Sequence, residues 1–194
     1  DDVELFAGGT IARLVSAGFQ VGVLDLTRGE AATRGTADLR LEESRVASTI
    51  LGVTERETLD LGDGDLSNTR DNRSLLVNLL RRMRPQVVMT HHPEDRHPDH
   101  RRASELVVDA VFFSNVGNYP AKGERWGVKA TCFFHGNTFR APPDADWVVD
   151  VSRFLEKKKE VLGAYRSQFQ ADLEDSKSTY IASRSFWEYM ERRM

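Results

Sequence analysis

The sequence predicts an α/β fold, a Rossmann-like, mainly parallel sheet with helices on both faces, in a single domain spanning residues 1–194. Two observations lead to this prediction. Apolar segments of strand length alternate with segments of helical periodicity along the whole chain, a pattern typical of right-handed βαβ units. The segment QVVMT at residues 86–90 is a continuous apolar run, as expected of a strand buried on both faces.

The first half of the chain contains three predicted helices and two predicted strands. Helices are expected where apolar residues recur every three or four positions, and strands where Val, Leu and Thr cluster or alternate with polar residues. We expect a helix at 8–18, a strand at 19–27, a helix at 36–52, a short strand at 56–62 and a helix at 72–85, ended by Pro85. The buried stripe of the second helix is predicted to consist of Leu39, Val46, Ile50 and Leu51.

The second half continues the alternation after the strand at 86–90. We expect a helix at 101–113, a strand at 128–136 that buries Cys132, a strand at 147–152 and one long helix at 152–169. The Gly- and Pro-containing stretch at 117–127 is the segment with the strongest loop character. The chain begins in what resembles a strand-to-helix connection, so we expect that a first strand and a C-terminal end lie outside it.

Composition narrows the classes of function. The net charge of −3 gives no basic footprint for nucleic acid. The single cysteine, Cys132, cannot form an intrachain disulfide, and no apolar run reaches the roughly 20 residues that a membrane helix needs. We therefore expect a cytoplasmic protein that binds neither nucleic acid nor membrane. A homo-oligomer is compatible with the sequence.

Four of the five histidines lie in the segment HHPEDRHPDH at residues 91–100, directly after the apolar strand. Open α/β sheets bind ligands at the carboxyl ends of their strands. Imidazole is a common metal ligand and a common acid or base, so this density of histidine favours metal or acid/base chemistry. A polar loop that caps the following helix remains the alternative.

Two further segments carry charged residues at predicted loops. Asp1 and Asp2 are adjacent carboxylates that can bind a cation between them, or can equally be exposed acids at a helix N-terminus. In the segment LTRGEAATRG, Arg28 and Arg34 flank Glu30. Arginine side chains of this kind suit a carboxylate or phosphate on a substrate, although an ordinary polar connection has the same composition.

These motifs, taken in order, resemble the PIG-L/LmbE family of metal-dependent N-acetylglucosaminyl deacetylases. The resemblance rests on DDVEL, on the TRGE and RLEE segments, on DRHPDH and on KKKEVLGAYRSQF, and it covers nearly the whole chain. The TRGE and YRSQ segments point to the branch that acts in bacillithiol biosynthesis. The substrate implied is N-acetylglucosaminyl malate, with another N-acetylglucosamine derivative, such as a chitooligosaccharide or an inositol conjugate, as the alternative.

The resemblance assigns roles to particular residues. It implies that Asp2 and His100 bind Zn²⁺, or alternatively Fe²⁺, together with a histidine expected upstream of Asp1. Asp1 is implied as the general base, and His97 as the charged group that stabilises the oxyanion, oriented by Asp99. The residues implied or suggested for substrate binding are Arg28, Glu30, Arg34, Arg40 and Asp63. His91 and His92 are expected to be loop residues or residues of the pocket wall.

Two other classes of protein are compatible with the same residues. A metallophosphoesterase also uses Asp and His ligands, although it typically binds two metal ions. An α/β binding module without catalytic activity is the non-enzymatic alternative. Metal content and the activity of Asp1→Ala and His100→Ala variants distinguish these possibilities.

Overall fold

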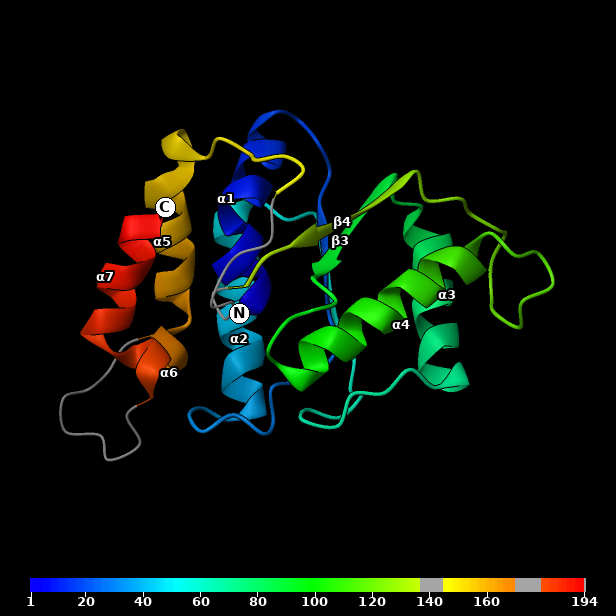
Figure 1. The fold of residues 1–194 in the computed structure, drawn as a ribbon, viewed down its shortest axis with the longest axis horizontal. Helices are drawn as coiled ribbons and strands as arrows, with labels where there is room; N and C mark the ends of the chain where they lie inside the picture. The colour runs from blue at the N-terminus through cyan, green and yellow to red at the C-terminus, as the bar shows by residue number, and fades with distance from the viewer. Residues whose placement is uncertain (137–144, 170–178, 194) are drawn as a thin grey trace. The chain divides into compact units, whose positions relative to one another are not determined.

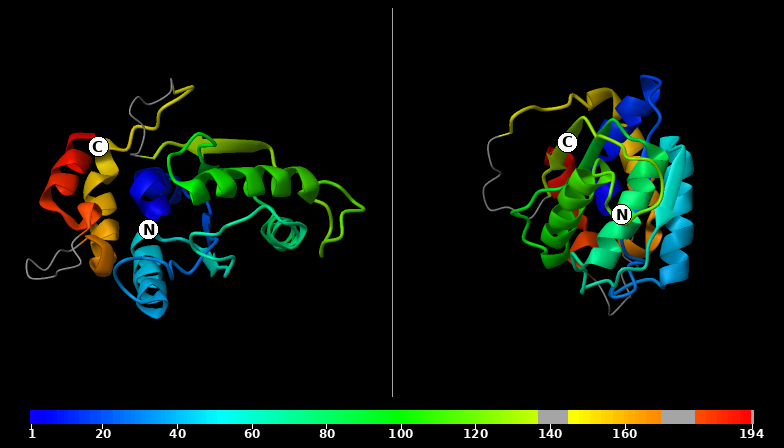
Figure 2. Two further views of the ribbon diagram at one scale, coloured as in Figure 1. Left: turned by 60° about the horizontal axis from the view of Figure 1, so that its bottom comes forward. Right: turned by 90° about the vertical axis from the view of Figure 1, so that its right-hand side faces the viewer.

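The computed structural model describes residues 1–136, 145–169 and 179–193 (Figures 1 and 2). The described residues form helices and two pairs of parallel strands, which confirms the predicted α/β class. They group into two compact units: unit 1 is Asp1–Asp60 with Ala145–Met194, and unit 2 is Leu61–Asp144. The single domain over the whole chain stays a prediction. Among the described residues, no helix is both long and apolar enough to cross a membrane.

Unit 1 is built around one βαβ element. Strands β1 and β2 pair in parallel, with Gly22 opposite Glu55 and Asp25 opposite Thr58, and α2 connects them. Helix α5 packs against both α1 and α2. The bounds are α1 Asp2–Ser16, β1 Gly22–Asp25, α2 Ala37–Leu51, β2 Glu55–Thr58, η1 Ser152–Phe154, α5 Leu155–Ala164, α6 Arg166–Phe169, η2 Tyr180–Ala182 and α7 Arg184–Arg193.

Helix α2 begins and ends where local chemistry places its caps, but its buried face differs from the prediction. The Thr36 side chain accepts a hydrogen bond from the Leu39 amide, and Gly52 ends the helix in the left-handed conformation. Leu39 and Val46 are 46% and 44% exposed, so the predicted stripe is wrong at these positions. Leu51 is buried as predicted, and the other buried residues of the helix are Glu43, Ser44 and Ala47, so polar groups occupy much of the buried face.

The buried centre of unit 1 contains an arginine held by two carboxylates. Arg56 on β2 contacts Asp25 through two hydrogen bonds, of 2.6 and 2.8 Å, and contacts Glu4 through one of 2.6 Å. Its guanidinium also donates to the Tyr165 hydroxyl at 3.2 Å. Burial raises the pKa of the Tyr165 phenol, and the carboxylate of Glu4 raises it further. The phenol therefore remains neutral, and the contacts of Arg56 join β2 to β1, to α1 and to the end of α5.

Two predictions for the C-terminal part are wrong. Residues 147–152 do not form a strand: 147–151 are irregular and Ser152 begins the short 3₁₀ helix η1. Val148 there is 86% exposed, so its apolar character reflects no buried strand position. The predicted helix at 152–169 is broken at Tyr165, whose φ of −85° and ψ of 62° are not helical, and it continues as α6. The break lets the α6 side chains point to α2, as described below.

Unit 2 is a second βαβ element, with strands β3 Val87–His91 and β4 Ala130–Phe134 in parallel and helix α4 Pro98–Ser114 between them in the chain. Helix α3 Arg70–Met83 packs against α4. The prediction that residues 86–90 are fully buried is wrong, because Val87 is 52% exposed. Within the described residues β3 pairs with one strand only. Cys132 lies in β4, as expected, but is only half-buried.

The predicted loop at 117–127 is confirmed as irregular, and one buried arginine holds it. Arg81 on α3 donates hydrogen bonds to four backbone carbonyls, those of Ser114, Val116, Ala121 and Gly123. Because a guanidinium carries five N–H donors in a fixed fork, it can satisfy several carbonyls of an irregular segment at once. This loop is therefore fixed to α3 by side-chain contacts rather than by regular structure.

Candidate metal and catalytic site

The histidine-rich segment runs from the end of β3 into the first turn of α4. His91 is the last residue of β3, and His97 is the N-cap of α4, where its Nδ1 accepts a hydrogen bond from the Asp99 amide at 3.2 Å. Pro98 occupies the first helical turn, where a missing N–H costs nothing. The segment is thus partly a helix N-terminus, and the spacing of HPDH places His100 on that first turn.

Three imidazoles of this segment form a row. The rings of His91 and His100 are stacked with centroids 3.8 Å apart and an interplanar angle of 16°. The ring of His97 lies on His100 with a centroid distance of 4.6 Å. His91 was expected in the loop or in the pocket wall; it is the last residue of β3, and its ring contacts that of the predicted ligand His100. The ring of His92 lies beside that of His135, with centroids 4.7 Å apart and the planes tilted by 36°.

A buried carboxylate, that of Asp95, lies beside the ring of His100. Asp95 is 1% exposed; its Oδ1 accepts the His97 amide at 2.8 Å and lies 3.2 Å from His100 Nδ1. A carboxylate on one ring nitrogen fixes the tautomer of an imidazole and leaves the other nitrogen as a ligand. Sequence reasoning missed this residue. Its position five residues before His100, within DRHPDH, is the only trace in the sequence.

Asp99 has a different contact from the one expected. Its Oδ2 accepts the Gly64 amide at 2.7 Å, and its backbone amide, not its carboxylate, bonds His97. Asp99 is 7% exposed, and its Oδ1 has no hydrogen-bond partner among the described residues. The carboxylate therefore connects the loop that contains Asp63 to the first turn of α4, and its Oδ1 remains a buried acceptor.

In unit 1, the predicted base and a predicted substrate residue contact each other. Asp1 is the N-cap of α1, and its Oδ1 lies 2.6 Å from Arg40 Nη2, with both side chains mostly buried. Asp2 is the first residue of α1 and is half-buried. Arg40 thus fixes one carboxylate oxygen of Asp1 and leaves the other for chemistry. The expectation that Arg40 binds substrate directly stays a prediction.

The other predicted substrate residues lie in connections. Arg28 is exposed and forms an ion pair with Asp38 at 3.0 Å, and its backbone amide donates to Glu30. The carbonyl of Arg34 accepts a hydrogen bond from Gln168. Asp63 stands between two glycines with positive φ, Gly62 and Gly64, in unit 2. The first three share the connection between β1 and α2, whereas Asp63 belongs to the other unit.

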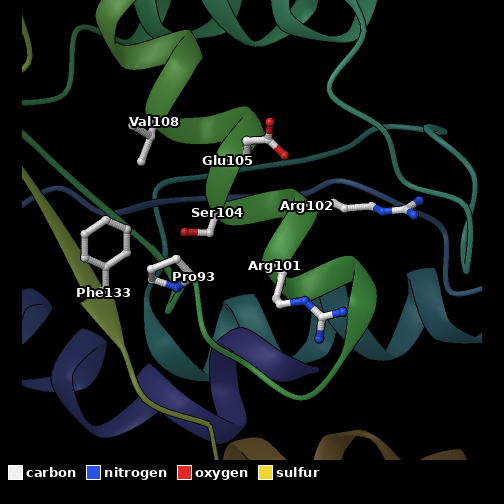
Figure 3. A pocket seen from close by; sticks show the side chains of 7 residues that line it. All are labelled: Pro93, Arg101, Arg102, Ser104, Glu105, Val108 and Phe133. Carbon is white, nitrogen blue, oxygen red and sulfur yellow. The ribbon is translucent and has the colours of Figure 1, made fainter. Parts of the chain in front are cut away.

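Unit 2 also carries an open hollow of about 550 Å³ between α4 and β4 (Figure 3). None of the histidines lines it; the lining residues are Pro93, Arg101, Arg102, Ser104, Glu105, Val108 and Phe133. Its two arginines hydrogen-bond to neighbouring backbone: Arg101 donates to the carbonyls of Asp95 and Arg96, and Arg102 to that of Leu66. The hollow therefore borders the histidine segment without containing its reactive groups.

Residues 1–111 match the family model described as PIG-L: GlcNAc-PI de-N-acetylase. The chain belongs to the PIG-L family. This match includes both the Asp1–Asp2 pair and the HPDH segment. Family membership was expected from the sequence and is confirmed.

Individual proteins and a solved structure are also similar to this chain. The chain is 30% identical over 196 residues to the diacetylchitobiose deacetylase of Thermococcus kodakarensis, covering 93% of this chain and 71% of that protein. It is 28% identical over 228 residues to the 1D-myo-inositol 2-acetamido-2-deoxy-alpha-D-glucopyranoside deacetylase of Rhodococcus jostii, covering 87% and 78%. Among solved structures it resembles the conserved protein TT1542 of Thermus thermophilus, with 41% identity and a TM-score of 0.82, covering 87% and 75%.

The donor groups of unit 2 fit a divalent metal ion. Two adjacent imidazoles, His91 and His100, offer nitrogen ligands, and the second nitrogen of His100 meets a buried carboxylate. This pairing of imidazole and carboxylate is usual at metal centres. The buried Oδ1 of Asp99 adds an acceptor to the same turn. His100 is therefore the residue of this unit best placed to bind a metal, with His91 beside it.

Replacing Asp95 by asparagine should weaken metal binding about 10- to 100-fold, because His100 loses the carboxylate that orients it. Isothermal titration calorimetry of the metal-free protein with Zn²⁺ or Fe²⁺ measures the metal affinity directly. Glu94→Gln, the same carboxylate-to-amide change at the exposed neighbouring residue, is the control and should bind metal like the unaltered protein. Equal affinity in the Asp95→Asn variant would remove Asp95 from the metal site.

Proposed function

We propose that this protein is a metal-dependent N-deacetylase that hydrolyses the acetamide of an N-acetylglucosamine conjugate. The observation that supports it most is the HPDH turn of a PIG-L chain, in which a buried carboxylate lies 3.2 Å from Nδ1 of His100. The named activities of the two curated relatives are both deacetylations of N-acetylated amino sugars. Neither the metallophosphoesterase nor the non-catalytic module has a comparable observation in its favour.

We assign the ligands from the family motif and from unit 2. His100 and Asp2 are the proposed ligands from the motif, and His91 is a further imidazole available beside His100. The assignment of Asp2 rests on the motif alone. The proposed metal is Zn²⁺, with Fe²⁺ as the alternative. Bound there, a divalent ion supplies Lewis acidity and lowers the pKa of a water ligand toward about 7.

The chain's own residues supply the proton transfers. Asp1, with one oxygen held by Arg40, is the proposed base that accepts the proton of the attacking water through its other oxygen. His97 is the proposed donor to the oxyanion. Its Nδ1 already accepts the Asp99 amide, so the neutral ring presents Nε2–H, whereas an imidazolium would lose this cap. The leaving amine then takes a proton either from Asp1, which has accepted one from the attacking water, or from His97 in its imidazolium form, in which Nδ1 no longer accepts the Asp99 amide.

The identity of the sugar conjugate is proposed separately. The malate conjugate of bacillithiol biosynthesis is suggested by the arginines at 28 and 34, because its two carboxylates need cationic partners. Diacetylchitobiose and an inositol conjugate are supported to the same extent by the relatives' names. Glu30 and Asp63 are the proposed partners of sugar hydroxyls. The oligomeric state stays a prediction.

Turnover of these three conjugates, measured as acetate released by the metal-loaded protein, decides between them. If the malate conjugate is the substrate, Arg28→Ala and Arg34→Ala should each reduce kcat/KM for it about 10-fold or more, and should change turnover of plain N-acetylglucosamine much less. Equal losses on both compounds would exclude a malate-specific role. Faster turnover of diacetylchitobiose by the unaltered protein would reassign the substrate.

A further inference from the structure

The short helix α6 reaches the arginine-bearing connection between β1 and α2, within unit 1. Gln168 is 5% exposed, and its Nε2 donates to the Arg34 carbonyl at 2.8 Å and to Ser167 Oγ at 3.0 Å. Gln168 and Arg34 are 134 positions apart in the sequence. The YRSQ segment is thus bonded to the backbone of the connection that contains the proposed substrate arginines.

The neighbouring serine is bonded just as closely to α2. The Ser167 amide donates to Glu43 Oε1 and the Ser167 hydroxyl to Glu43 Oε2, each at 2.7 Å. Glu43 is 6% exposed, so both oxygens of a buried carboxylate are occupied by one residue. Charge-assisted bonds of this kind are stronger than bonds between neutral groups. Since they also fix the backbone at Ser167, they fix the position of Gln168.

Two glycines show how tightly the connection is held at both ends. A Cβ on Gly29 would lie 2.9 Å from Arg40 Cζ, and a Cβ on Gly35 would lie 2.9 Å from Ser167 Oγ. Both glycines have positive φ, 69° and 77°. Arg40 and Glu43 are one helical turn apart on α2, so one face of this helix carries the contact to Asp1 and the contact to Ser167.

We propose that Ser167 and Gln168 are positioning residues that fix residues 29–35 for recognition of an anionic group on the aglycone of the sugar conjugate. Gln168 holds the Arg34 backbone, Ser167 holds Gln168 in place through Glu43, and Arg40 supports the other end of the connection. The proposal rests on the proposed deacetylase function. It assigns a role in substrate specificity to YRSQ, which takes no part in the proton transfers.

The experiment compares Gln168→Leu with Gln86→Leu, a matched change at an exposed glutamine of unit 2. Amide hydrogen exchange of residues 29–35 should be about 10-fold faster in Gln168→Leu. The variant loses the hydrogen bond to the Arg34 carbonyl, so this connection should open locally more often. For the malate conjugate, KM should rise about 10-fold while kcat changes by less than about twofold. The KM and kcat for plain N-acetylglucosamine should be unchanged in this variant, and so should its affinity for the metal. Gln86→Leu should resemble the unaltered protein throughout.

Unchanged exchange at 29–35 in Gln168→Leu would overturn the positioning role, whatever the enzyme's activity. Faster exchange with equal KM changes for the acidic and the neutral sugar would overturn the role in anion recognition. If the unaltered protein deacetylates none of the conjugates, the proposed function fails, and the exchange measurement alone decides the positioning role. If Gln168→Leu does not fold, Ser167→Ala, which removes one of the two bonds to Glu43, is judged by the same two measurements.

Discussion

Replacing Arg56 by methionine should lower the free energy of unfolding by about 3–5 kcal/mol, since it leaves one fully buried and one largely buried carboxylate without their shared cation. Glu4 is fully buried, and the side chain of Asp25 is only 19% exposed. Removing one partner of a buried ion pair costs far more than the pair itself contributes. For a chain of this length the loss corresponds to a fall in Tm of roughly 6–20 °C. Chemical and thermal denaturation measure both quantities.

A matched control and a double variant make this prediction specific. Arg45→Met removes an exposed ion pair with Glu42, whose side chains are 66% and 65% exposed, and should change stability by less than about 1 kcal/mol. Adding Glu4→Gln to Arg56→Met should restore part of the lost stability, because one uncompensated charge disappears. If Arg56→Met proved as stable as Arg45→Met, the network around Arg56 would not hold unit 1 together.

Replacing Asp1 by asparagine should reduce kcat about 10²- to 10⁴-fold, the usual range for loss of a general base. An amide cannot accept the proton of the attacking water, although it preserves the size of the side chain. Metal content should stay unchanged, because Asp1 is proposed as the base and not as a ligand. Steady-state kinetics and metal analysis of the same preparation test both parts.

Two comparisons interpret the Asp1→Asn result. His100→Ala should lose activity together with metal, whereas Asp1→Asn should lose activity alone. Glu42→Gln, an exposed carboxylate on α2, should keep both. Loss of metal in Asp1→Asn would show that this residue is a ligand, and full activity would remove it from the reaction.

Local patterns predicted most of the elements, because their causes are local. The caps of α2 at Thr36 and Gly52, for example, require nothing beyond the neighbouring residues. The buried face of that helix was predicted wrongly for a reason that lies elsewhere in the chain. Glu43 is buried because Ser167, 124 residues later, satisfies both of its oxygens. No periodicity of apolar residues in 36–52 could indicate this partner.

In the candidate site, too, the local motif was predicted from the sequence and the tertiary contacts were not. The HPDH segment was recognisable, and the structure does place its histidines at the end of β3 and on the first turn of α4. The sequence did not indicate that His91 and Asp95 lie against His100, since these contacts depend on how a strand end, a turn and a helix N-cap meet. Nor could the sequence show that the Asp99 carboxylate accepts a hydrogen bond from the Gly64 amide and that the Asp99 amide donates one to His97. These contacts follow from tertiary packing.

The most direct test of the proposed reaction is the joint measurement of acetate and free amine released from N-acetylglucosamine conjugates by the metal-loaded protein. The proposed function predicts equal amounts of the two products from at least one conjugate, loss of both when a chelator removes the metal, and loss of both in His100→Ala. Absence of acetate from the malate, chitobiose and inositol conjugates alike, with metal bound, would contradict it.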